Sequence, residues 1–67
     1  MKLNELTGAE YHYFRQNCPF SDREIAVLDL CRRGASLVET ALTLHVSTAT
    51  VSRVRRSIQK KITREQG

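Results

Sequence analysis

The residues of this 67-residue chain that could do chemistry gather near its C-terminus. From Arg53 to Arg64 every charged side chain is basic, and the preceding residues, Ser47 to Ser52, are mostly small or carry hydroxyls. Small side chains let a backbone approach a nucleic acid groove, hydroxyls donate to bases or phosphates, and arginine and lysine reach base edges and phosphates. This pattern favours binding to a polyanion.

The net charge of +4 is unevenly distributed along the chain. Residues 1–31 hold three basic and five acidic side chains, whereas residues 32–67 hold eight basic and two acidic ones. A charge concentrated in one half indicates a nucleic acid partner more strongly than the same charge spread evenly. The alternative is that the basic run is only the solvated face of a helix.

Other kinds of site are not indicated. His12, His45, Cys18 and Cys31 lack the spacing of a metal site, so we expect no metal and no cofactor. The sequence shows no nucleophile with a partner base and no phosphate-binding loop, and so short a chain has little room for an enclosed substrate cavity. We therefore expect no enzymatic activity.

Targeting signals are also missing from the sequence. It has neither a run of about 18 apolar residues nor a charged leader followed by an apolar stretch, so we expect no membrane contact and no export. The expected location is the cytoplasm. In that reducing compartment, Cys18 and Cys31 are expected to be free thiols.

Four helices are predicted to position these residues. A Ser or Thr stands three residues before a Glu, the pattern of a capping box at a helix start, in the pairs Thr7 and Glu10, Ser21 and Glu24, and Ser36 and Glu39. With Ser47 as a fourth N-cap, and with Pro19 and Gly34 as breaks, the sequence predicts helices over 8–17, 22–33, 37–44 and 48–63. No segment alternates like a strand. The expected fold is a small all-α, four-helix domain.

The last two predicted helices have the spacing of a helix-turn-helix, because only three residues join them. At 100° per residue, segment 48–63 has an apolar side with Val51, Ile58 and Ile62. The opposite side carries Ala49, Ser52, Arg53, Arg56 and Lys60. We expect Ala41 where the two helices cross and Val46 in the turn. The segment 48–63 is therefore the predicted recognition helix for a major groove.

Residues 20–62 resemble the LuxR/GerE-type DNA-binding domain, aligned without a gap. The resemblance is carried by Ser21-Asp22-Arg23-Glu24, Val27-Leu28, Gly34, Ser36, Glu39, Ala41, Leu44, Val46-Ser47, Ala49-Thr50-Val51, Ser57-Ile58 and Lys61. It implies a four-helix transcription-factor module without a wing, usually dimeric. By position it also implies base contacts at Ser52, Arg53 and Arg56, and phosphate contacts at Ser47, Thr50 and Lys60.

Residues 46–54 also resemble the helix-turn-helix of lactose-repressor-type regulators, which would turn Thr48, Ala49 and Arg53 toward the groove. Sigma factor region four is similar as well.

The expected base-reading set is Thr48, Ala49, Ser52, Arg53 and Arg56. The expected phosphate-binding set is Ser47, Thr50, Lys60, Lys61 and Arg64. The expected function is sequence-specific binding of double-stranded DNA in transcriptional regulation. The alternatives are a sigma-region-four-like or adaptor module that binds RNA polymerase or another protein, and an excisionase-like protein of a mobile element.

The chain departs from the LuxR/GerE pattern in three ways. Thr40 replaces an aliphatic residue, and Arg55 stands at a normally apolar position that Val54 is expected to fill. The C-terminal helix through which the family usually dimerises has no counterpart before Gly67. We therefore divide the chain into an N-terminal helix at 1–19 and a helix-turn-helix domain at 20–67. Tyr11 and Phe14 of the first part are expected either to complete the core or to form a homodimer interface.

Overall fold

The structure, a computed structural model, describes residues 3–66 apart from the side chain of Asn4. A short 3-10 helix, η1 (Leu3–Glu5), precedes four α-helices: α1 (Gly8–Asn17), α2 (Asp22–Arg32), α3 (Leu37–Leu44) and α4 (Thr48–Gln66). No strand occurs in this range. The all-α prediction is therefore confirmed.

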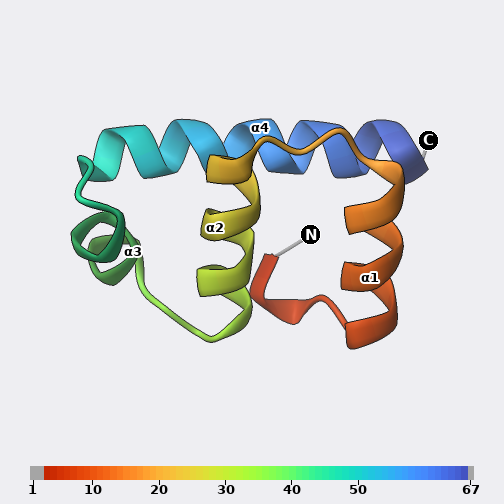
Figure 1. Cartoon of the computed structure of the whole chain (residues 1–67), viewed down its shortest axis with the longest axis horizontal. Coiled ribbons are helices and arrows are strands. Elements are labelled where there is room, and N and C mark those ends of the chain that lie inside the picture. Colours follow the sequence, from red (N-terminus) through yellow and green to blue (C-terminus); the bar gives the residue numbers. More distant parts are fainter. Residues whose placement is uncertain (1–2, 67) are drawn as a thin grey trace.

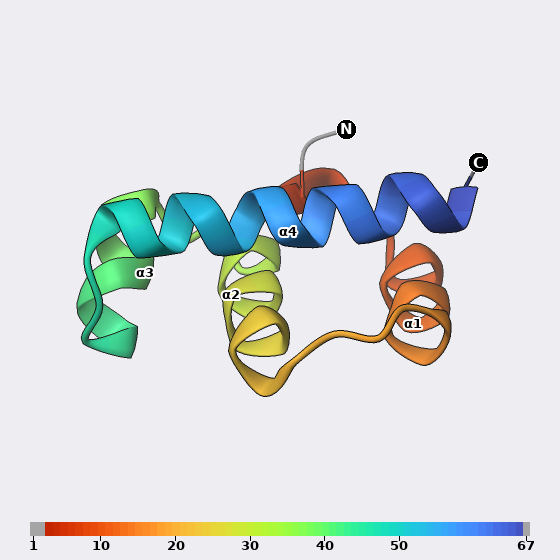
Figure 2. The same ribbon diagram turned by 90° about the horizontal axis from the view of Figure 1, so that it is seen from above.

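The longest helix, α4, lies across the other three (Figure 1). Both views show α1, α2 and α3 on one side of α4, with α3 near its N-terminus and α1 near its C-terminus (Figure 2). At 1.5 Å per residue its 19 residues span about 28 Å, close to the molecule's longest dimension of 31 Å. One side of α4 is thus free along its whole length.

The helices begin where the capping boxes predict. In each box the Ser or Thr hydroxyl accepts a hydrogen bond from the backbone N–H of the Glu three residues later. The Glu carboxylate accepts one from the N–H of the cap, at Thr7, Ser21 and Ser36. The ends are predicted less well. α2 stops one residue before the expected Arg33, and α4 continues three residues beyond Thr63 because Arg64, Glu65 and Gln66 are good helix formers.

The core is one cluster beneath α4. Val51, Ile58 and Ile62 of α4 are fully buried, as the helical spacing predicts, and so is Leu28 of α2. Fully burying one such side chain contributes about 1.5–3 kcal/mol to the free energy of unfolding. The inner face of α4 is therefore buried in the core, and only the outer face is accessible to a partner.

The N-terminal part of the chain completes this core. Phe14 is 3% exposed, and Tyr11 is half-buried with its hydroxyl donating to the carboxylate of Asp29. Both aromatics thus pack in the core, and a homodimer interface through them stays a prediction. Leu3 and Leu6 are also buried, which no pattern in the sequence had indicated.

Candidate nucleic-acid interface

The helix-turn-helix is made by α3, residues 45–47 and α4. Ala41 of α3 is 6% exposed and Val51 of α4 is fully buried, so the two helices cross closely, and half-buried Val46 packs against the core from the turn. These placements follow the prediction. They fix the start of α4 relative to α3, which a groove-binding helix requires.

The turn closes through a left-handed residue. His45 has φ 57° and ψ 43°, and the N–H of Val46 donates to the carbonyl of Ala41 at 3.0 Å. This hydrogen bond closes a loop of six residues, from 41 to 46, and satisfies a carbonyl in the last turn of α3. Glycine or asparagine usually takes this position, because a side chain costs about 1–2 kcal/mol in the left-handed region.

The N-terminus of α4 is exposed and capped. The hydroxyl of Ser47 accepts from the N–H of Thr50 at 3.1 Å and lies 3.0 Å from the hydroxyl of Thr50. Thr48 and Ala49 are exposed, and Thr50 is half-buried. Free N–H groups and the helix dipole make this end suitable for a phosphate.

The outer side of α4 carries a continuous basic row. We call Arg53, Arg56, Lys60 and Arg64 the outer row; all four are exposed, whereas Ser52 beside them is half-buried. Within the part of the chain that the structure describes, none of the four forms an ion pair. Their charge is therefore available to a partner.

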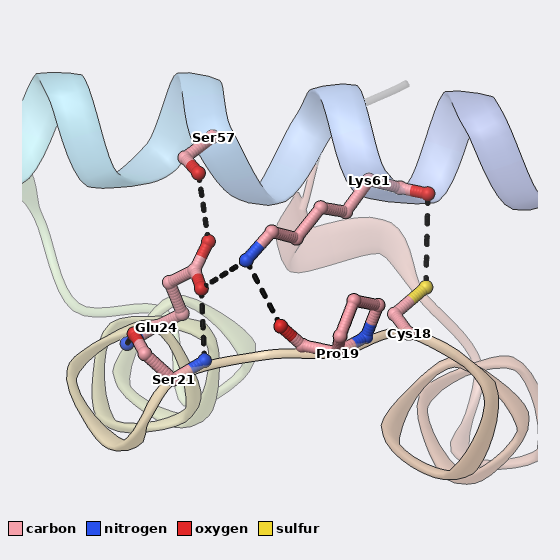
Figure 3. Close-up of polar contacts among 6 residues, drawn as sticks. All are labelled: Cys18, Pro19, Ser21, Glu24, Ser57 and Lys61. Carbon is pink, nitrogen blue, oxygen red and sulfur yellow. Dashed lines mark hydrogen bonds and ion pairs between the residues drawn. The ribbon is translucent and has the colours of Figure 1, made fainter.

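Lys61 differs from these four residues. Its Nζ lies 2.6 Å from Oε1 of Glu24 and donates to the carbonyl of Pro19 at 3.0 Å (Figure 3). Its side chain is only 27% exposed. The structure thus turns Lys61, one of the residues expected to bind phosphate, inward to α2 and away from the outer row.

Glu24 is the centre of this inward network. It is 5% exposed, and its carboxylate also accepts from the N–H of Ser21 at 2.8 Å and the hydroxyl of Ser57 at 2.8 Å. Burial acts to raise the pKa of Glu24, but the bonds from Lys61, Ser21 and Ser57 outweigh it and lower the pKa to about 2. The capping box revealed the bond to Ser21, but no short spacing in the sequence pointed to Ser57 or Lys61.

The two unusual residues of the helix-turn-helix are accommodated locally. Thr40 is 1% exposed, and its hydroxyl donates to the carbonyl of Ser36 at 2.9 Å, so the polar atom is satisfied. Val54 packs against the core, and Arg55 is half-buried. Val54 thus fills the apolar position, as expected.

The described residues provide neither a metal site nor a membrane-spanning helix, and their two thiols are buried. Across residues 3–66 no group of three or more His, Cys, Asp or Glu side chains could hold a metal ion. None of the described helices combines the length and apolar character that crossing a bilayer requires. Cys18 and Cys31 are buried free thiols, and burial raises the pKa of each, which makes them poor nucleophiles.

Comparison with known families agrees with this geometry. The family model described as bacterial regulatory proteins, luxR family, matches residues 18–65, more than half of the chain. The chain belongs to this luxR family. The match covers α2, α3 and nearly all of α4, and leaves α1 outside except for its C-cap, Cys18. Comparisons with curated proteins and with solved structures gave no significant match.

Membership in the luxR family makes the chain a helix-turn-helix domain of DNA-binding regulators. The part that the family match leaves out, η1 and α1, packs against α2 and the C-terminal end of α4. Tyr13 donates to the carboxylate of Glu65 at 2.9 Å, which joins α1 to the last turn of α4. In this luxR-family chain, the N-terminal helix thus supports the C-terminal end of α4.

Proposed function

We propose that this chain binds double-stranded DNA sequence-specifically and thereby regulates transcription, with the first turns of α4 in the major groove. Base edges would be read by Thr48, Ala49, Ser52, Arg53 and Arg56. Phosphates would be bound by Ser47, Thr50, Lys60 and Arg64. We leave Lys61 out of the phosphate contacts because its ammonium group already pairs with Glu24.

The observation that carries the proposal is the contrast between the two sides of α4. On the inner side the charge of Lys61 is neutralised by Glu24, whereas the outer row keeps four exposed cations without an ion pair in the described chain. Small Ala49 precedes that row and lets the backbone come close to a groove. This order along the helix, small residues first and cations later, suits a helix that enters a groove by its N-terminus.

Selection of bound sequences from a random pool of DNA duplexes tests the proposal. A regulator of this kind, acting in the cytoplasm, should enrich one motif. A palindromic motif would indicate a homodimer, and a single half-site a monomer. No enrichment would overturn sequence-specific binding.

Salt dependence separates DNA binding from the adaptor alternative. The logarithm of the binding constant should fall steeply with the logarithm of the salt concentration, with about −0.9 per phosphate neutralised. Lys60→Ala should make this slope shallower by about one unit, while Lys60→Arg, which keeps the charge, should not. A flat response would instead favour a module that binds RNA polymerase or another protein.

A further inference from the structure

A second group of cations lies on the opposite side of the molecule from the outer row. Arg32 and Arg33 stand at the C-terminal end of α2, and Arg15 lies on α1. Figure 1 shows this end of α2, with the N-terminal half of α1, on the side away from α4. DNA held by the outer side of α4 would not reach Arg32 and Arg33. Arg15 stands in the second half of α1, but its guanidinium group is turned toward Tyr11 in the first half.

The group is organised around Tyr11. The guanidinium carbon of Arg32 lies 4.2 Å from the ring centroid of Tyr11, and that of Arg15 lies 5.9 Å from the same point. The two cations are therefore at most about 10 Å apart, close to the Debye length at physiological salt. Arg15 also donates to the hydroxyl of Tyr11 at 3.3 Å, so the ring orders both guanidinium groups.

The group is not neutralised within the part of the chain that the structure describes. The nearby carboxylate of Asp29 accepts from the hydroxyl of Tyr11 and forms no ion pair with an arginine in the described range. The negative end of the α2 dipole offsets part of the charge of Arg32 and Arg33, but it acts within one turn and is weak at exposed positions. Three exposed guanidinium groups thus retain most of their capacity to bind an anion.

The surface here is hollow and mainly polar. Tyr11, Asp29, Arg32 and Arg33 line a depression of about 320 Å³. A duplex presents its phosphates on a broad convex surface, whereas a carboxylate on a flexible chain can enter a hollow and accept two bonds from one guanidinium. The shape therefore favours an acidic peptide over a second DNA duplex.

We propose that the hollow formed by Tyr11, Arg32 and Arg33, with Arg15 at its edge, binds an acidic segment of a partner protein. Because the hollow and the outer row lie on opposite sides, the chain can hold this partner and DNA at the same time. Carboxylates of the partner would pair with Arg32 and Arg33, which line the hollow beside Tyr11.

A nuclear magnetic resonance titration of the whole chain with a peptide of eight glutamates tests the proposal, with a peptide of eight glutamines as the uncharged control. The amide signals of Tyr11, Asp29, Arg32 and Arg33 should shift with the acidic peptide only. The double variant Arg32→Gln, Arg33→Gln should bind it roughly tenfold more weakly or worse, since two charge-assisted contacts are lost.

The double variant Arg53→Gln, Arg56→Gln is the matched control, because it removes the same charge from the outer side of α4. It should change peptide affinity less than about threefold, the effect of general attraction alone. Circular dichroism melting shows whether each variant is folded.

Three results would overturn the proposal. The first is no binding of the acidic peptide at low salt, and the second is a set of shifts confined to α4 with equal losses in both double variants. The third is a duplex that shifts the signals of Tyr11 and Arg33 as strongly as the peptide does, which would make the hollow a second DNA surface.

Discussion

Replacing Glu24 by glutamine tests whether the network beneath α4 stabilises the packing of α4 on α2. Glu24→Gln keeps the shape of the side chain but removes the charge that faces Lys61. In the folded chain the pKa of Glu24 is about 2, against an ordinary value of 4.5. At 1.36 kcal/mol per unit, the interactions that keep the carboxylate charged contribute about 3 kcal/mol at neutral pH.

That contribution is large for so short a chain. A domain of this length has a free energy of unfolding of roughly 3–10 kcal/mol. Because glutamine can still accept from Ser21 and Lys61, we expect Glu24→Gln to lose about 2–3 kcal/mol. At 4–8 °C per kcal/mol, this lowers the melting temperature by about 10–20 °C.

The pH dependence of the free energy of unfolding provides a second test of the same interaction. Because folding lowers the pKa of Glu24, its contribution is complete above about pH 5 and is lost as the pH falls toward 2. The wild-type chain should therefore lose stability across this window. Glu24→Gln should lose less over the same window, since glutamine does not titrate.

Urea unfolding followed by circular dichroism, at several pH values between 2.5 and 7, measures both effects. Glu39→Gln is the matched control, because Glu39 occupies the same capping-box position in α3 but faces solvent. It should change stability much less. Equal losses for the two variants, or an unchanged acid transition in Glu24→Gln, would show that the ion pair contributes little and would refute this reasoning.

The other predictions concern α4, the turn and α1. Arg53→Ala should weaken binding to a selected site by about 1–3 kcal/mol more than binding to random DNA, since arginine pairs bidentately with guanine; competition between the two duplexes measures this. Lys61→Met should lower the melting temperature, because it removes the ion pair with Glu24, and should leave the salt dependence of DNA binding unchanged. Lys60→Ala, in contrast, should make that salt dependence shallower; thermal melting and salt titration of DNA binding measure the two effects. His45→Gly should raise the free energy of unfolding by about 1 kcal/mol by removing the left-handed strain; an unchanged urea midpoint would contradict it. Phe14→Ala should lose about 3–5 kcal/mol in urea unfolding because it empties a fully packed position.

Local signals predicted the helix starts. The boxes at Thr7, Ser21 and Ser36 operate within one turn of backbone, so four residues of sequence contain the whole interaction. The inner stripe of α4 was predictable for a similar reason, because Val51, Ile58 and Ile62 repeat with the helical period. Neither inference needs knowledge of distant contacts.

Contacts between distant segments were not predictable from spacing. Lys61 and Glu24 are 37 residues apart, and only the packing of α4 on α2 brings them together. On a helical wheel Lys61 lies near the boundary between the two faces, so its role depends on which neighbour approaches it. The buried Leu3 and Leu6 illustrate the same limit, since two leucines in a short segment carry no clear period.

The position of α4 across the other helices bears on how such a domain could acquire new targets. Its inner face supplies much of the core, while Ala49, Arg53 and Arg56 on its outer face are exposed, and their side chains form no hydrogen bond or ion pair within the described chain. A library randomised at these three positions should therefore remain folded in most of its members. Under the proposed function, the arrangement separates the evolution of DNA preference from the maintenance of the fold, and would make this chain a scaffold for retargeted regulators.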